Sequence, residues 1–407
     1  MTMDLAQVRF VEAADVYKAG ILAATLRRTA TGVVFDYDPG YRARAGAPVA
    51  STLPLDAAPM VTPAGAVPAF FAGLLPEGRR LSALRRAVKT SADDELSLLV
   101  AVGADTVGDV QVVPHGQPPT RPRPHLEIDD WSSVRFADVL RDDPANVDLT
   151  ALPGVQAKVS AVTIAVPTGG QFILKLDPPE YPHVVANEAF FLRAAGLSDL
   201  ATVAADVVTD ADGRQGLLVR RFDRRVTDDG RVVGFAQEDA CQALGGYPAD
   251  KYSVTTEAAL GALVALTRAK PLAARDLLAQ VAFAYLTGNG DQHAKNLSVV
   301  QTEGGEWRAA PAYDVPSTYP YGDVTMALSI GGTARDSLTR ASFVRLGLGL
   351  GVPERATGKL LDRLCEAVDA WVGDLPTLPF DERRLHKLGR LIADRRAKLS
   401  QLVHPAR

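Results

Sequence analysis

The chain has 407 residues, with 44 basic and 48 acidic side chains and a formal net charge of −4. A chain of this length is expected to divide into two or more lobes. Its acidic balance argues against direct, non-specific binding to nucleic acid, which needs a surplus of basic residues.

The cysteines and the N-terminal sequence indicate the cellular compartment in which the protein is expected. The two cysteines, Cys241 and Cys365, exclude a disulfide scaffold and fit a reducing environment. The N-terminus lacks the basic and then apolar pattern of a secretion signal, and we find no run of about 18 apolar residues that could span a bilayer. We therefore expect a cytoplasmic protein with no membrane contact.

The first third of the chain predicts a small sheet followed by helices. Residues 7–37 contain short β-branched and aromatic runs separated by glycine-bearing turns, which is typical of antiparallel strands. Residues 66–102 have apolar side chains at helical spacing. The segment 114–125 contains five prolines, which favour an extended linker. We therefore predict an N-terminal subdomain at 1–113 and a linker at 114–125.

The next region, 126–224, is predicted to bind nucleotide. Two β-patterned runs at 157–166 and 171–176 are joined by a Pro-Thr-Gly-Gly hairpin turn. Gly154 precedes the first run, where a loop covering a nucleotide is expected. Lys175 stands at the end of the second run, and kinases use a lysine in this place to contact the α- and β-phosphates.

A helical pattern follows, and its Glu188 is placed to pair with Lys175. Two further strand patterns lead to the segment Arg-Arg-Phe-Asp-Arg at 220–224, where the linker between two kinase lobes is expected. Backbone groups from Val219 to Phe222 would then hydrogen-bond adenine, with the Phe222 ring beside it.

The last region, 225–407, is predicted to be a helical lobe that carries the catalytic loop. Helical patterns cover about 236–244, 253–267 and 270–286, and residues 338–404 are helical with proline breaks. Between them lies the segment that organises the whole interpretation.

That segment contains Asp291, Asn296 five positions later, and Asp314 after a connecting turn. In kinases an aspartate orients the attacking hydroxyl and accepts its proton, while an asparagine and a second aspartate hold Mg²⁺ against the phosphates. A single Asp and Asn pair occurs by chance in many chains, so the prediction rests on the parts appearing in order. No Gly-rich P-loop motif occurs, which disfavours a P-loop nucleotidase.

Ten short segments together resemble the HipA family of serine/threonine kinases, the toxins of toxin–antitoxin pairs. Each is weak alone, but all ten occur in the family's order over nearly the whole chain. They are STLPL (51–55), FFAGLLPEG (70–78), PGVQAK (153–158), FILK (172–175), NEAF (187–190), RRFDR (220–224), QEDACQALG (237–245), TGNGDQHAKNLSV (287–299), PAYDVPST (311–318) and MALSIGG (326–332).

The resemblance implies an α+β, two-lobed protein-kinase-like fold, with an N-terminal subdomain of a small β-sheet plus helices and an all-helical C-terminal lobe. It implies ATP and Mg²⁺ as cofactors. It assigns Asp291, Lys175 and His293 to catalysis and Asn296 and Asp314 to the metal. The residues that it assigns to the nucleotide are Gly154, Val155, Gln156, Lys158, Lys175, Val219, Arg220, Phe222, His293 and Tyr313.

His293 occupies the position two residues after the catalytic aspartate, where protein kinases usually have lysine. A neutral imidazole there could donate a hydrogen bond to the γ-phosphate, and protonation would strengthen that bond. Many small-molecule kinases have a histidine at this position, so a small-molecule kinase stays open as an alternative. A catalytically inactive binding protein with the same fold is the third hypothesis.

The resemblance also implies regulation and partners. The best-known family members autophosphorylate a serine three residues before the loop glycine, but this chain has Ala151 there, and Thr150 beside it is the adjacent acceptor. Arg220 is a second departure, because some members have glutamate before the RFD element. The implied partners are a HipB-like helix-turn-helix antitoxin, through which DNA is contacted indirectly, and a protein substrate such as an aminoacyl-tRNA synthetase.

Overall fold

A computed structural model of the chain describes residues 8–120, 130–139, 164–168, 171–178, 180–228, 231–334 and 337–400. Within these ranges no helix is both long and apolar enough to cross a bilayer. The positions predicted from sequence that lie outside the described residues are Thr150, Gly154, Val155, Gln156 and Lys158.

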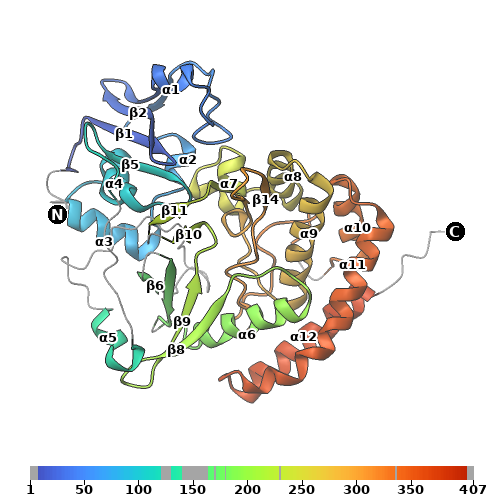
Figure 1. Ribbon diagram of the computed structural model, residues 1–407. Coiled ribbons are helices and arrows are strands. Elements are labelled where there is room, and N and C mark those ends of the chain that lie inside the picture. Colours follow the sequence, from blue (N-terminus) through green and yellow to red (C-terminus); the bar gives the residue numbers. More distant parts are fainter. Residues whose placement is uncertain are drawn as a thin grey trace.

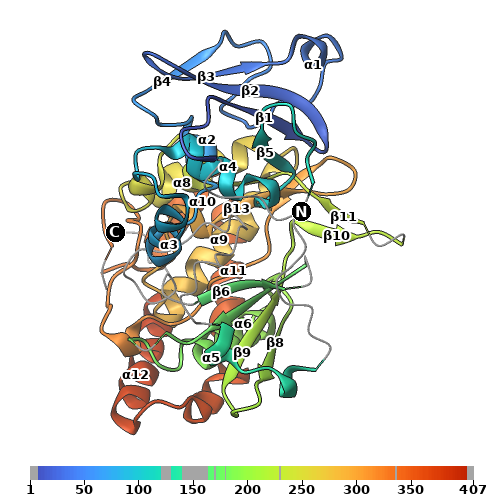
Figure 2. The same cartoon turned by 90° about the vertical axis from the view of Figure 1, so that its left-hand side faces the viewer.

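The first region is built on a five-stranded antiparallel sheet in the order β4-β3-β2-β1-β5, at the top of Figure 2. The turn at Ala19 and Gly20 joins its first two strands with φ angles of 48° and 80°, as a two-residue hairpin turn requires. The strands predicted within 7–37 are therefore confirmed. The five strands are β1 (Ala13–Lys18), β2 (Ile21–Thr29), β3 (Gly32–Tyr37), β4 (Met60–Pro63) and β5 (Val110–Pro114).

Four helices accompany this sheet. The second-longest, α4, is buried on nearly all sides, while α3 is amphipathic and buries Leu84 and Val88, as its predicted helical spacing requires. The four helices are α1 (Pro39–Ala43), α2 (Ala69–Ala72), α3 (Gly78–Val88) and α4 (Glu95–Val102).

A second antiparallel sheet has the order β6-β7-β9-β8, and helix α6 (Val184–Leu197) packs against it. Its hairpin from β6 to β7 was predicted, although Pro167 and Thr168 belong to β6 and not to the turn. Proline is tolerated there because β6 is an edge strand. The strands are β6 (Ile164–Thr168), β7 (Phe172–Leu176), β8 (Ala205–Thr209) and β9 (Gln215–Arg220), and the short α5 (Phe136–Val139) lies nearby (Figure 1).

The last region is mostly helical, and its predicted helices appear close to their expected bounds. They are α7 (Ala240–Ala243), α8 (Thr256–Leu266), α9 (Lys270–Thr287), α10 (Arg340–Gly349), α11 (Glu354–Ala367) and α12 (Glu382–Ser400).

The expectation that this lobe is all-helical needs correction, because five short strands lie among its described residues. A hairpin of β10 and β11 is followed by a three-stranded sheet, β12-β13-β14. Strand β12 occupies part of the segment predicted as helix, and it forms because Gln237 pairs with Val300, which lies far along the chain. Local periodicity cannot reveal such a pairing. The strands are β10 (Arg224–Val226), β11 (Val232–Gly234), β12 (Gln237–Asp239), β13 (Ser298–Gln301) and β14 (Trp307–Ala309).

Helix α9 connects this architecture to the predicted catalytic loop. Figure 2 shows the five-stranded sheet at the top and the four-stranded sheet at the bottom, with α9 at a height between them. Its side chains are buried along most of its length. Arg395 of α12 donates a 2.6 Å hydrogen bond to the carbonyl of Tyr285, in the last turn of α9. The end of α9 is thereby fixed where the loop begins.

Candidate active site

Lys175 lies between two carboxylates. Strand β7 presents its ammonium group to Glu188 of α6, with Nζ 2.6 Å from Oε1, and to Asp314, which it contacts directly. Burial would lower the pKa of Lys175, but the charges of Asp314 and Glu188 outweigh burial and raise it above its usual range. The lysine is therefore a fixed cation, and the pairing predicted between Lys175 and Glu188 is present.

Glu188 is almost completely buried, at 1% exposure, whereas the Asp314 side chain is 28% exposed. Burial, followed by the Asp314 charge, raises the pKa of Glu188, and Lys175 opposes that shift. Glu188 therefore contacts the lysine from the interior, and Asp314 is the carboxylate of the pair that solvent reaches.

The loop after α9 begins with a sharp change of direction at Gly288. Its φ of 73° ends the helix in the left-handed conformation that favours glycine, and a Cβ there would come within 2.7 Å of Leu391. Asn289 then accepts a 2.9 Å hydrogen bond from the amide of Asp291 and donates a 3.3 Å bond to the carbonyl of Asp314. One side chain thus holds the two predicted acidic residues in a fixed relation.

Asp291 is fully buried and held from two further directions. The hydroxyl of Tyr252 donates to its carboxylate at 2.8 Å, and the amide nitrogen of Asn296 donates to its backbone carbonyl at 2.9 Å. The second bond uses the nitrogen end of the Asn296 amide, so the oxygen end is directed elsewhere. An amide oxygen is the end that binds a hard cation.

Asp314 lies at the start of a turn and has a φ of 50°, a left-handed conformation that aspartate tolerates better than most residues. The turn is fixed to α6 because Asn187 donates a 2.8 Å bond to the carbonyl of Ser317 and accepts a 3.0 Å bond from its amide. Asn296 and Asp314 thus offer an amide oxygen and a partly exposed carboxylate, a donor set that fits Mg²⁺ completed by phosphate oxygens and water.

His293 lies in the same loop with only 2% of its surface exposed, and its Nδ1 has no hydrogen-bond partner among the described residues. Burial, together with the nearby ammonium groups of Lys251 and Lys295, holds its pKa well below the usual range. The imidazole is therefore neutral near pH 7. Protonation, which was expected to strengthen a phosphate contact, is disfavoured here.

A pair of aromatic rings lies where adenine is expected. Phe222 and Tyr313 have ring centroids 5.4 Å apart and tilted by 34°. Tyr313 donates a 2.9 Å bond to the carbonyl of Lys295 in the loop. The backbone amides of Arg220 and Arg221 already donate to the carbonyls of Ala204 and Gln171, at 2.8 and 2.7 Å. These two amides therefore cannot also donate to adenine, although the prediction counted them among the backbone groups that would bind it.

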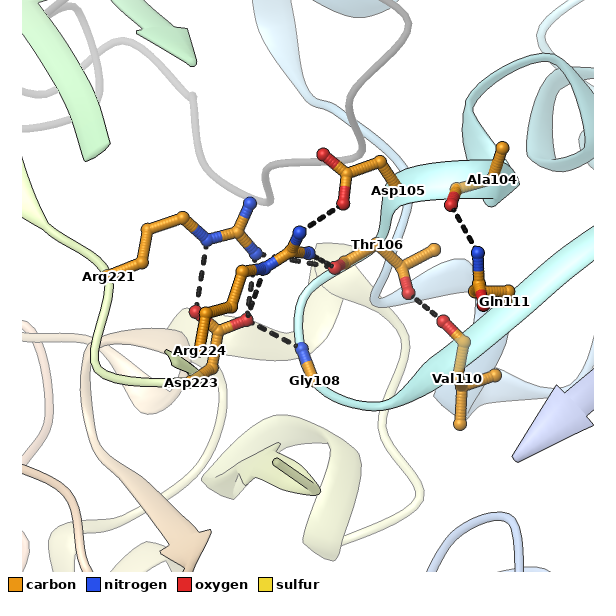
Figure 3. Close-up of polar contacts among 9 residues, drawn as sticks. All are labelled: Ala104, Asp105, Thr106, Gly108, Val110, Gln111, Arg221, Asp223 and Arg224. Atoms are coloured by element: carbon orange, nitrogen blue, oxygen red, sulfur yellow. Dashed lines mark hydrogen bonds and ion pairs between the residues drawn. The ribbon is translucent and has the colours of Figure 1, made fainter. Parts of the chain in front are cut away.

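The segment beside these rings is fixed to the N-terminal region by a buried cluster of charges. Arg221 binds Asp223 through two hydrogen bonds of 3.0 and 2.8 Å, and Asp223 also accepts a 2.8 Å bond from the amide of Gly108. Burial opposes ionisation of Asp223, but Arg221 and Arg224 hold its pKa well below the usual range. Figure 3 shows the cluster, in which Arg221, Asp223 and Arg224 face Asp105, Thr106 and Gly108.

The structure thus brings together the described residues that the sequence assigned to the phosphate contact, its supporting glutamate, the catalytic carboxylate and the metal, namely Lys175, Glu188, Asp291, Asn296 and Asp314. Sequence reasoning missed Tyr252, Asn187 and Asn289 as the residues that orient them. Two of the three lie inside segments that the sequence had singled out, NEAF and TGNGDQHAKNLSV, so membership of those segments was the available signal.

Comparisons with known proteins give matches over most of the chain. The family model described as the HipA N-terminal domain matches residues 14–113, and the one described as the HipA-like C-terminal domain matches residues 150–372. A Sinorhizobium fredii protein provisionally named a kinase is 33% identical over 360 residues, covering 82% of this chain and 85% of that protein.

The serine/threonine-protein kinase toxin HipA of Shewanella oneidensis is 28% identical over 383 residues, covering 83% of this chain and 84% of that toxin. The solved structure of Shewanella oneidensis HipA with HipB and its operator DNA superposes with a TM-score of 0.74, over 95% of this chain and 96% of that one, at 24% identity. That likeness shows a common fold.

Proposed function

The chain belongs to the HipA family of kinases, and we propose on that basis that it transfers the γ-phosphate of ATP to a serine or threonine of another protein. The observation that carries this proposal is the position of Lys175, Glu188, Asp291, Asn296 and Asp314 around one site, held by the hydrogen bonds and ion pairs given above. These are the parts that phosphoryl transfer requires.

Each residue then has one role. Asp291 orients the substrate hydroxyl and accepts its proton as the oxygen–phosphorus bond forms and the bond to the leaving ADP breaks. Lys175, held by Glu188, contacts the α- and β-phosphates. Asn296 and Asp314 would hold Mg²⁺, which neutralises charge on the phosphates when it is bound. The rings of Phe222 and Tyr313 contact the base.

The neutral His293 fits this scheme because its Nδ1, which has no hydrogen-bond partner within the described part of the chain, would take part in a hydrogen bond near the phosphates. Four positions outside the described residues, Gly154, Val155, Gln156 and Lys158, belong to the same proposal as the loop over the phosphates. Thr150, next to Ala151, is the proposed acceptor if the chain modifies itself.

We further propose that the chain is the toxin of a cytoplasmic toxin–antitoxin pair. The solved relative was studied together with HipB and operator DNA, and an analogous small helix-turn-helix antitoxin would supply the DNA contact here. The net charge of −4 supports an indirect contact, because DNA binding needs a basic surface. An aminoacyl-tRNA synthetase is the proposed class of substrate, since its phosphorylation would stop tRNA charging.

Transfer of label from γ-labelled ATP in the presence of Mg²⁺ and a lysate of the protein's own cells tests the activity. We expect a labelled protein band whose label is on serine or threonine, and no band with Asp291→Ala. Asp276→Ala is the matched control, because Asp276 is a partly exposed aspartate on α9 that forms an ion pair of 2.7 Å with its neighbour Arg275, away from the site.

The other outcomes decide between the alternatives. Label in small molecules alone would replace the proposal with a small-molecule kinase. Absence of label in every fraction, with correctly folded protein, would favour a binding protein without turnover. Labelling by Asp291→Ala equal to that by the unmodified chain would contradict the role of Asp291.

A further inference from the structure

The segment FFAGLLPEG has no role in the kinase chemistry described above, although it is among the segments that identify the chain. Its two phenylalanines are core residues of the N-terminal region, at 3% and 0% exposure. Glu77, near its end, is a charged residue with only 8% exposure. A buried carboxylate needs partners, so its surroundings show what the segment does.

Glu77 binds two lysines from the other side of the molecule's domain boundary. Its Oε2 lies 2.7 Å from Nζ of Lys251, and its Oε1 lies 2.7 Å from Nζ of Lys295. The lysine side chains are 0% and 2% exposed. Lys295 also donates a 3.1 Å bond to the carbonyl of Gly73 in the same segment. One carboxylate therefore holds two buried cations at once.

The first lysine connects Glu77 to the metal-binding part of the catalytic loop. Lys295 lies in the short 3₁₀ turn η7 (Ala294–Asn296), and the next residue is Asn296. The Asn296 side chain donates in turn to the carbonyl of Asp291. A shift of the Lys295 ammonium therefore moves the backbone that carries Asn296.

The second lysine connects Glu77 to the catalytic carboxylate. Lys251 lies in the 3₁₀ turn η6 (Pro248–Tyr252), directly before Tyr252, and its ammonium lies 5.4 Å from the centroid of the Tyr252 ring. The Tyr252 hydroxyl donates 2.8 Å to the carboxylate of Asp291. Both connections from Glu77 thus end on Asp291, one at its side chain and one at its backbone.

We propose that Glu77 is a positioning residue for the catalytic loop, so that the N-terminal domain completes the active site of the kinase. This inference rests on the proposed function, since it names a residue that acts on the same site through Lys251 and Lys295. Glu77 itself touches neither the nucleotide nor the reacting hydroxyl.

A different role for Glu77 would be to hold the two domains together without affecting the loop. A variant that restores packing but not the charges separates the two roles. The triple variant Glu77→Leu, Lys251→Met and Lys295→Met replaces the buried ions with apolar side chains, and such replacements are often neutral or stabilising. Its melting temperature is therefore expected to equal that of the unmodified chain or exceed it.

The expected kinetic result is a kcat reduced by about 100-fold with KM for ATP within about threefold, because a small misplacement of catalytic groups costs rate rather than nucleotide binding. Ser51→Ala is the matched control. Ser51 also joins the N-terminal domain to the C-terminal lobe, through Glu238, but it does not reach the catalytic loop. Its kcat is expected to stay unchanged.

Hydrogen–deuterium exchange of residues 288–297 without nucleotide gives a readout that does not need turnover. We expect faster exchange in the triple variant than in the unmodified chain, and no change in Ser51→Ala. If the unmodified chain transfers no phosphate, the proposed function is wrong. The exchange rates of residues 288–297 still show whether Glu77 orders the loop in that case.

Unchanged exchange, or an unchanged kcat in a well-folded triple variant, would overturn the inference. If the triple variant does not fold, Glu77→Asp decides the question, because it keeps the charge and shortens the side chain by one methylene. We expect it to lower kcat by about tenfold with an unaltered melting temperature. A kcat equal to that of the unmodified chain would overturn the inference here too.

Discussion

Two clusters of three charged side chains lie at and beside the proposed active site, and their charges are reversed. In the lysine-centred cluster, Lys175 lies between Glu188 and Asp314. In the glutamate-centred cluster, defined by Glu77, Lys251 and Lys295, one carboxylate lies between two lysines. With all groups ionised the first carries a net negative charge and the second a net positive one.

The two clusters differ in exposure as well as in charge. Asp314 in the lysine-centred cluster is 28% exposed, so the surplus negative charge can attract a cation from solution. The lysines of the glutamate-centred cluster have at most 2% exposure, so no ligand can enter between them. The exposed, net negative cluster is therefore the one suited to bind a cation, and the buried cluster is suited only to hold its neighbours in place.

The largest expected effect comes from removing the central lysine. Lys175→Met is expected to lower the rate of phosphate transfer by about 10³-fold, or about 4 kcal/mol, because the cation that contacts the phosphates is lost. Single-turnover transfer at saturating ATP measures this, with the melting temperature as a check on folding. Retention of more than about a tenth of the rate would contradict the binding role of this cluster.

A second, smaller expected effect concerns how the stability that Glu77 contributes depends on pH. Its two lysines lower its pKa to about 2 despite burial, against a value of 4.5 for the unperturbed group. The pKa is depressed in the folded state, so the stabilisation is present above pH 4.5 and is lost as pH falls toward 2. The part of the unfolding free energy that depends on this ionisation amounts to about 3 kcal/mol.

Urea unfolding of the unmodified chain and of the triple apolar variant, at several pH values from 7 to about 3, measures this contribution. We expect the unmodified chain to lose stability relative to the variant as the pH falls below 4.5. Parallel curves over this range would mean that Glu77 is not the stabilising anion of its cluster.

The same contrast explains what the sequence could and could not predict. Asp291, Asn296 and Asp314 lie within one short stretch, and Lys175 lies near the end of a strand whose apolar pattern is visible. Their order along the chain was therefore enough to predict that they belong to one site. Glu77 and Lys295 are 218 residues apart in the sequence, and no local pattern predicts that they form an ion pair.

The strands of the fold show the same difference between local and distant contacts. Strands β1 to β3 follow one another with short turns and were predicted, whereas β12 was predicted as helix because its pairing with β13 joins distant segments. Tyr252 was missed for the same reason, since nothing near it in the sequence indicates that its hydroxyl meets Asp291. Functional residues that lie close together in the sequence can be predicted from it. The residues that orient them come into contact only through tertiary packing and cannot be predicted in this way.

Calorimetric titration of ATP, with and without Mg²⁺, tests most directly that Lys175, Asp291, Asn296 and Asp314 surround one metal-bound nucleotide. For the unmodified chain we expect Mg²⁺ to tighten ATP binding by about tenfold or more, and we expect Asp314→Ala to lose that increment while binding ATP alone. No heat with ATP and Mg²⁺, or an equal Mg²⁺ effect in both proteins, would contradict the account.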